Sequence, residues 1–373
     1  MKQASLGLNL STKKTRKREF LHDMERVVPW SALIAIVEPH CPRSKTGRPP
    51  FAVETMLRIH YLQQWFGLSD PAMEEALRDV PLHREFAGLD AGTDRLPDES
   101  TILRFRHLLE RHNLALDMLR LVNDILQAKG LMLRTGTAVD ATLISAPSST
   151  KNASGERDPE MKQTKKGNNG YFGMKAHIGV DAHSGLVHTV VATAANVNEL
   201  NVAGQLLHGE EQAAFGDAGY QGVHKRAEAQ GPTWHVAMRA GKRKKLNPFI
   251  EADFIAETIE QCKASIRAKV EHPFRVIKRQ FGFTKVRYRG LAKNTAQVVT
   301  LFRAVEPVDG EAATDGCAGM SALAMCESGT QGLGFDDAVP AVDSTNQLAS
   351  PCSAASASSA FAPRFSSCFS DVP

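Results

Sequence analysis

Three carboxylates lie in separate segments whose local sequence could hold a divalent metal. They are Asp140 in TAVDATLI, Asp217 in AAFGDAGYQG and Glu271 in SIRAKVEHPFRVIKRQFGF. Around the third acid, Arg267, Glu271 and Lys278 recur at spacings of four and seven. On a helix this spacing places them within roughly 40° of one another. An acid held between two cations suits a group that works on phosphate, and oxygen ligands suit Mg²⁺.

Each acid also has a purely structural interpretation. Asp140 ends an apolar run, where an unpaired carboxylate is costly, but it could cap a helix or a turn. Asp217 lies between glycines that allow tight turns and close backbone approach, and it could form a simple Asx-turn. Glu271 could pair with Arg267 on a solvent-facing helix. Asp181, in VDAHSG, competes as a site residue but is better interpreted as part of a hairpin turn.

The predicted helix around Glu271 places that acid at the border of the core. Apolar side chains occupy an arc beside the line of Arg267, Glu271 and Lys278, namely Ile266, Val270, Phe274, Ile277 and Phe281. Pro273 removes a backbone donor and predicts a kink near Glu271. The acid is therefore expected beside packed side chains rather than directly in water.

Composition excludes several classes of protein. The 373 residues are enough for two or three domains. No stretch approaches the ~20 continuous apolar residues of a membrane span, and the basic N-terminus lacks the apolar region of a signal peptide. The six cysteines show no CxxC or Cys/His ligand spacing, which argues against a zinc finger or a disulfide framework. We expect a protein of the reducing cytoplasm.

Charge is distributed unevenly along the chain. Residues 303–373 contain two basic and nine acidic side chains, which leaves 43 basic and 32 acidic ones in residues 1–302, a net charge of +11. A basic body of this kind is typical of a nucleic-acid binder. A basic soluble protein without such a partner is the alternative, and charge alone does not separate the two.

The N-terminal third is predicted to be helical. Residues 1–20 form an expected flexible basic arm, and residues 21–130 an all-helical domain. Ser69 is the predicted cap of one helix, Ser100 or Thr101 that of another, and Gly130 the end of a third. The segments 68–89 and 97–112 permit a helix-turn-helix interpretation in which Arg104, His107 and Arg111 face DNA. An ordinary packing domain with a solvated basic face is the alternative.

Residues 131–302 have the pattern of an α/β domain. We predict a buried strand over 131–144, a polar loop over 145–170, and a hairpin with its turn at His183–Gly185. A mixed sheet covered by helices is the expected architecture. The remaining expected elements are the hairpin strands 172–183 and 184–196, strands 210–219 and 233–239, and helices 198–209, 223–231 and 252–281.

With these residues in place, the chain resembles bacterial insertion-sequence transposases with a DDE site, specifically the insertion-sequence-five group of the insertion-sequence-four-like superfamily. The resemblance spans about residues 15–302. It rests on GRPPFAVETMLRIHYLQQWFGLSD, VDATLISAPSSTKN, QTKKGNNGYFGMKAHIGVDAHSGLVH, GDAGYQG and IRAKVEHPFRVIKRQFGFTKVRYRGLAKN. It implies an RNase H-like catalytic domain over 131–302, with Asp140, Asp217 and Glu271 as catalytic and metal-binding residues. In the superfamily signature Tyr-x₂-Arg-x₃-Glu-x₆-Lys the tyrosine position is Ala264 here.

The resemblance also implies cofactor and partners. Two Mg²⁺ ions, with Mn²⁺ as an alternative, would be bridged by Asp140 and completed by Asp217 and Glu271. The partners would be the double-stranded ends of the element and target DNA, with a homodimer or larger assembly on the DNA. The reaction would be DNA cleavage followed by strand transfer, the chemistry of DNA transposition and recombination.

Basic residues supply the expected contacts to DNA. Arg267 and Lys278 would hold phosphate oxygens near the scissile bond. The further expected DNA-binding residues are Lys175, His177, Lys242, Arg243, Lys244, Lys245, Arg275 and Arg279, and a second patch comprises Lys285, Arg287, Arg289 and Lys293.

The resemblance stops after Phe302. The family continues into an apolar and basic helix, whereas residues 303–373 are acidic, lysine-free and of low complexity, and are expected to be disordered. One inserted base near codon 303 would explain the change, and the tail would then be out of frame. Two alternatives to an active transposase follow, a catalytically defective DNA-binding relic and an RNase H-like nuclease without strand transfer.

Overall fold

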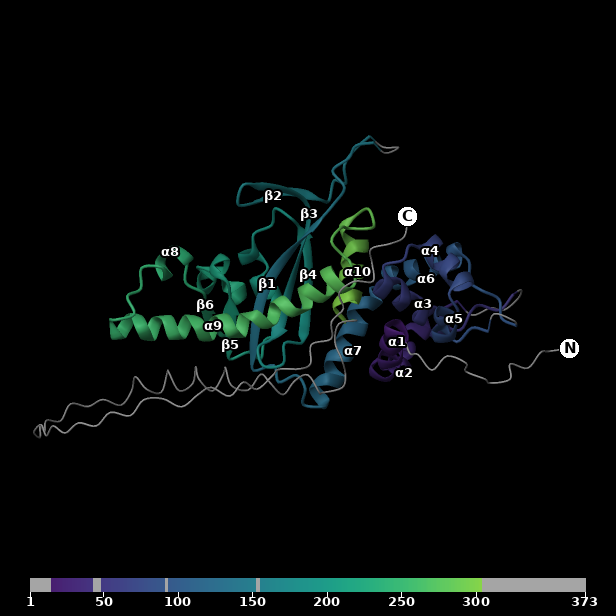
Figure 1. The fold of residues 1–373 in the computed structure, drawn as a ribbon, viewed down its shortest axis with the longest axis horizontal. Coiled ribbons are helices and arrows are strands. Elements are labelled where there is room, and N and C mark those ends of the chain that lie inside the picture. The colour runs from purple at the N-terminus through teal and green to yellow at the C-terminus, as the bar shows by residue number, and fades with distance from the viewer. Residues whose placement is uncertain (1–14, 43–47, 91–92, 152–154, 304–373) are drawn as a thin grey trace, which may run out of the picture. The chain divides into compact units, whose positions relative to one another are not determined.

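The computed structural model describes residues 15–42, 48–90, 93–151 and 155–303 (Figure 1). The expected disordered tail at 304–373 and residues 1–14 of the expected basic arm lie outside these ranges. Residues 16–20 of that arm instead begin the first helix. The helices of the N-terminal part are α1 (Arg16–Val27), α2 (Trp30–Val37), α3 (Val53–Phe66), α4 (Asp70–Asp79), α5 (Pro81–Ala87), α6 (Glu99–Arg111) and α7 (Leu114–Ala128), with a 3₁₀ turn η1 at Glu38–His40.

The ends of these helices follow local chemistry. Ser69 caps α4 as predicted, since its hydroxyl accepts a hydrogen bond from the Ala72 N–H. The predicted cap of α6, Ser100 or Thr101, was wrong. The cap is Asp98, whose carboxylate accepts a hydrogen bond from the Thr101 N–H at 2.8 Å. A carboxylate at this position also complements the positive end of the helix dipole. Gly130 follows α7 with φ of +72°, as a C-terminal glycine should.

A mixed six-stranded sheet forms the second part, as predicted. Its strands run in the order β2-β3-β1-β5-β6, and β4 also pairs with β3. β1 is antiparallel to β3 and parallel to β5, and β5 is parallel to β6. The bounds are β1 Gly136–Ser145, β2 Lys162–Lys166, β3 Asn169–Asp181, β4 Val187–Ala194, β5 Ala213–Gly216 and β6 Thr233–Val236.

Several predicted elements differ from the structure. β2 lies in the segment that we expected to be a loop. The predicted helices at 198–209 and 223–231 are instead short 3₁₀ turns. The first is replaced by η2 Glu199–Asn201 and η3 Ala203–Leu206, and the second by η5 Val223–Lys225 and η6 Ala227–Ala229. A further 3₁₀ turn, η4 Ala218–Tyr220, lies between them. The turns η3 and η6 pack closely at Gly204, where a Cβ would lie 2.0 Å from the Glu228 carbonyl oxygen. Any residue with a side chain at this position would force the two segments apart.

The two faces of the sheet have different cover. Ala138 and Ile144 of β1 belong to the main core together with Val270 of the long helix α9 (Glu251–Arg275), which crosses the sheet in Figure 1. Val139 points the other way, into a smaller core formed with the 3₁₀ turns. Because side chains alternate along a strand, Asp140 is on the α9 face of β1.

The C-terminal helices complete the fold. The predicted long helix is present as α9, which continues as a π-helical turn η7 (Val276–Gln280) shortly after Pro273. A short helix α8 (Ala240–Arg243) precedes it, and α10 (Leu291–Arg303) packs against α7 and β4. We had placed Arg303 in the tail, but it is buried in α10 with its guanidinium 4.3 Å from the Tyr61 ring centroid. Within the described ranges, no helix is long and apolar enough to span a bilayer.

Candidate functional site

The strand pairing brings two of the predicted acids side by side. Ala138 of β1 is paired with Phe215 of the parallel strand β5. Asp140 lies two residues beyond Ala138, and Asp217 lies two residues beyond Phe215 and one residue past the end of β5. Extending this register would place both acids on the same face, because parallel partners project to the same side. The third acid, Glu271, comes from α9, which packs against both strands on that face. Glu271 is exposed, so the expectation that it would be shielded from water by packed side chains was wrong.

Burial and the charges of the other two acids both act on the carboxyl of Asp140. The pKa of Asp140 rises to about 6, first because the carboxyl is buried and then because the charges of Asp217 and Glu271 repel its ionised form. The Ala141 N–H, which donates to Asp140 Oδ1 at 2.7 Å, and the nearby Arg267 guanidinium act in the opposite direction. Burial and like charge outweigh these two contacts, so the cluster carries unbalanced negative charge.

Asp217 has the Asx-turn geometry as well as the position beside Asp140. It caps η4, and its Oδ1 accepts the Gly219 N–H at 2.8 Å. The turn fixes the direction of the carboxylate while leaving the second oxygen for another partner. The two interpretations of Asp217 are therefore compatible.

Glu199 is an acid of this region that the sequence did not reveal. A Cβ on Gly219 would lie 2.7 Å from Glu199 Oε2 and 2.9 Å from Asp217 Oδ1, so both carboxylates border the same glycine. Lys175 Nζ lies 3.3 Å from Glu199 Oε1 and bonds the Val197 carbonyl. Beside them, Tyr220 is fully buried, and burial followed by the charge of Glu199 raises its pKa.

The two cations of the predicted helix line have different surroundings. Arg267 is half-buried and close enough to Asp140 to favour its ionised form. Lys278 is held by β1: its Nζ donates to Thr142 Oγ1 at 2.6 Å and to the Leu143 carbonyl at 2.9 Å. Lys278 therefore joins the π-helical turn to the strand that carries Asp140.

His177 is not exposed to DNA in this structure, contrary to the prediction. It is fully buried and shares a 2.9 Å hydrogen bond with Thr193 Oγ1, and burial lowers its pKa to about 4. Its partner in β1 is Ala141, so it lies on the face of the sheet away from α9. Lys175 lies on that face too, paired with Glu199 as described. Alternation along β3 explains both positions.

The other predicted DNA-binding side chains are at the surface. Arg243 of α8 pairs with Glu257, at 2.5 Å between Nη2 and Oε1. Asp181, the competing acid, is confirmed as a turn residue, because it accepts from Ser184 and from the Arg134 N–H. The exposed cations are Lys242, Lys244, Lys245, Arg275, Arg279, Lys285, Arg287, Arg289, Lys293, Arg104 and Arg111, while His107 is half-exposed.

Comparison with known proteins agrees with this geometry. Residues 132–305 match the family described as "Transposase DDE domain". Residues 8–108 match the family described as "Transposase domain (DUF772)". No solved structure matches the chain. Two transposase families on one chain, in this order, support a DDE transposase.

Proposed function

We propose that this transposase binds the terminal inverted repeats of an insertion sequence of the insertion-sequence-five group and catalyses DNA cleavage and strand transfer. Asp140, Asp217 and Glu271 are its catalytic residues. The observation that carries the proposal is the convergence of these acids, from two parallel strands and one helix, on one face of the sheet. The raised pKa of Asp140 is the electrostatic sign of that convergence.

An RNase H-like fold is part of the proposal. The supporting features are a central β1 that is antiparallel to β3 on one side and parallel to β5 on the other, with α9 across one face. This arrangement puts the first acid on the middle strand and the second on its parallel neighbour. Residues 131–302 would form that domain, and residues 21–130 would form a helical domain that contacts DNA through Arg104, His107 and Arg111.

The donor set fits divalent cations. All three side chains offer carboxylate oxygens, the ligands that Mg²⁺ and Mn²⁺ prefer. Burial and mutual repulsion keep Asp140 partly protonated near pH 6, and a bound cation would relieve both costs. Asp140, Asp217 and Glu271 would hold two ions, which when bound would supply Lewis acidity to the scissile phosphodiester.

The remaining residues position the acids and the DNA. Arg267 is placed to hold a phosphate oxygen near Asp140. Lys278, bonded to Thr142 and Leu143, fixes α9 on β1 and thereby sets the distance of Glu271 from Asp140. The exposed cations of α8 and of residues 285–293 supply a surface for the DNA backbone. We propose a dimer or larger assembly on the two ends, since both ends must be joined to one target.

The test is a strand-transfer assay with the purified chain, Mg²⁺ and a supercoiled donor plasmid carrying the element ends. Cleavage plus joining, abolished in Asp140→Asn, Asp217→Asn and Glu271→Gln, supports the proposal. Binding of the ends without cleavage would instead identify a catalytically defective relic, and cleavage without joining a nuclease. Asp124→Asn, at an exposed acid of α7, is the matched control and should remain active.

A further inference from the structure

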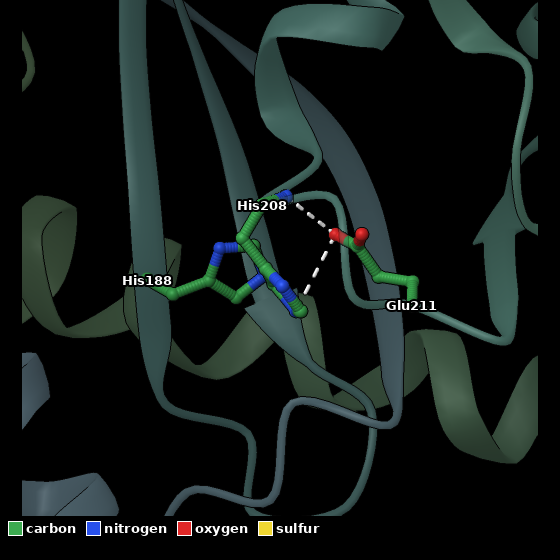
Figure 2. A group of neighbouring side chains, drawn as sticks. All are labelled: His188, His208 and Glu211. Carbon is green, nitrogen blue, oxygen red and sulfur yellow. Dashed lines mark hydrogen bonds and ion pairs between the residues drawn. The ribbon is translucent and has the colours of Figure 1, made fainter.

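A second cluster of metal-ligating side chains lies apart from the three acids. His188 of β4, His208 and Glu211 each offer one ligand atom, and these atoms lie within 4.8 Å of one another (Figure 2). His188 and Glu211 are buried, and the His208 side chain is 10% exposed. The two imidazole rings meet edge to face with centroids 4.9 Å apart.

A β-bulge places His188 in this cluster. β3 and β4 pair Gly179 with Thr189 and Val180 with Val187, so that His188 falls outside the ladder. The Asn123 side chain of α7 satisfies the His188 carbonyl at 2.9 Å. Bulges redirect single side chains, and here the redirected ring points to the start of β1 and to the loop before β5.

Hydrogen bonds fix the proton positions of His188. Thr137 Oγ1 donates to Glu211 Oε1 at 3.0 Å, which uses its only proton. His188 Nε2, 3.0 Å from the same Oγ1, must therefore donate to it. Glu211 also accepts the His208 and Gly209 backbone N–H groups, at 2.6 and 2.7 Å. The carboxylate is thus held in place from three directions.

The two ring nitrogens of His208 have different surroundings, since Nδ1 accepts the Glu210 N–H at 3.3 Å. Its Nε2 is buried and finds no hydrogen-bond partner among the residues that the structure describes. It faces Glu211 Oε1 at 3.4 Å (Figure 2). Because Nδ1 is an acceptor, the proton of the neutral ring lies on Nε2, directed toward the Glu211 carboxylate. The ring nitrogen and the carboxylate oxygen thus already face each other as two ligand atoms would.

We infer that His188, His208 and Glu211 form a binding site for a transition-metal ion, with Zn²⁺ the expected occupant. Tetrahedral Zn²⁺ with bonds of about 2.1 Å separates its ligand atoms by about 3.4 Å, the separation of His208 Nε2 and Glu211 Oε1. Two imidazoles and one carboxylate suit Zn²⁺ better than Mg²⁺. Binding through Nε2 would require the ring proton of each histidine to move to Nδ1. The Nδ1 proton of His188 could then donate to Thr189 Oγ1, whereas that of His208 would replace the contact of Nδ1 with the Glu210 N–H. Water or the Thr137 hydroxyl would complete the coordination.

The inferred site is structural and separate from the acids. Thr137 precedes Asp140 by three residues on β1, which is about 10 Å along a strand, and its side chain projects from the opposite face. An ion there would tie the starts of β1 and β4 to the loop before β5 without contacting a substrate bound at Asp140. It would stabilise the folded sheet.

Zinc content of the full chain tests the inference. The chain is stripped with a chelator, reloaded with Zn²⁺ and dialysed. Its zinc content is then measured by elemental mass spectrometry, and about one tightly bound zinc per chain is expected. His208→Ala should abolish the bound zinc, because it removes one of the three ligands. Asp140→Asn and the exposed-histidine control His224→Ala should keep the zinc, which separates this site from the proposed catalytic one.

A second measurement does not depend on any variant folding. In saturating Mg²⁺, Zn²⁺ should raise the thermal midpoint of the stripped unmodified chain further, with a one-to-one equivalence point, and Co²⁺ should give a tetrahedral visible spectrum. Two results would overturn the inference: an unmodified chain that retains no zinc after reloading, or zinc that persists in His208→Ala. Loss of zinc from Asp140→Asn would also overturn it, since the ion would then belong to the three acids.

Discussion

Replacing Asp140 by asparagine should stabilise the metal-free protein at neutral pH. The pKa of Asp140 rises from 3.8 to about 6, chiefly through burial. The folded state therefore binds the proton more tightly than the unfolded state, and stability is lost as pH increases from about 4 to about 6. Asparagine cannot ionise, and its side-chain oxygen can still accept the Ala141 N–H that Asp140 accepts.

The size of the effect follows from the shift. About two pKa units, at about 1.4 kcal/mol each, give about 3 kcal/mol as the upper value of the stability gained by Asp140→Asn. The gain should be near zero at about pH 4 and reach its plateau above about pH 6. The same substitution should abolish DNA cleavage, so stability and activity would change in opposite directions.

Urea unfolding of the chelator-treated unmodified chain and the Asp140→Asn variant, from pH 4 to 8, measures this difference. Asp124→Asn, at an exposed acid, should show no comparable pH-dependent difference. Added Mg²⁺ should stabilise the unmodified chain at pH 7 and narrow the gap to the variant. A difference between variant and unmodified chain that does not change with pH, or a variant that is less stable at pH 8, would refute the raised pKa of Asp140 and therefore its burial beside the other two acids as the cause.

Three further outcomes follow from contacts in the structure. Lys278→Met should lower the free energy of unfolding by about 1–3 kcal/mol, because it leaves strand acceptors unpaired, whereas Arg267→Gln should reduce cleavage and leave urea unfolding nearly unchanged. Gly204→Ala should destabilise by about 1–3 kcal/mol, since its Cβ would lie 2.0 Å from a backbone oxygen, while Gly241→Ala, with nothing within 4 Å, should not. Arg106→Met should lower the free energy of unfolding by about 3 kcal/mol or more, because the buried guanidinium pairs with the carboxylates of Asp70 and Glu110 at 2.9 and 2.7 Å. Thermal unfolding measures the loss, and an unchanged midpoint would show that the pairs are not formed.

The sequence correctly predicted features that depend only on residues close together in the chain, such as a helix cap, a helix end and a turn. The Ser69 cap, the glycine after α7 and the turn at Asp181 depend on residues within a few positions of each other. Hydrophobic periodicity also predicted the strand that carries Asp140 and the helix that carries Glu271. The choice of Asp140, Asp217 and Glu271 as a set came from the family resemblance as well as from local pattern, and their catalytic role stays a prediction.

Features that depend on distant partners could not be predicted in this way. Glu199 is relevant to the site only because Lys175 and Gly219 approach it in space. The turns that replaced the expected helices are set by contact between Gly204 and Glu228. His188 enters its cluster through a bulge, which leaves no ligand spacing in the sequence. Alternation along β3 determines the face of the sheet on which His177 lies. Its burial could not be predicted, because it depends on the segments that cover that face.

β1 connects the two clusters. Asp140 projects to the face covered by α9, and Thr137 projects to the face of His188 and Glu211. A slip of one residue in the pairing of β1 would exchange these faces, separating Asp140 from Asp217 and Thr137 from His188. Close approach at Gly179, where a Cβ would lie 2.7 Å from His188 Cε1 and 2.4 Å from the Leu206 carbonyl oxygen, holds β3 against the same cluster. In the proposed function, an ion in the histidine cluster would act through register, by keeping on the α9 face the strand that carries the first acid.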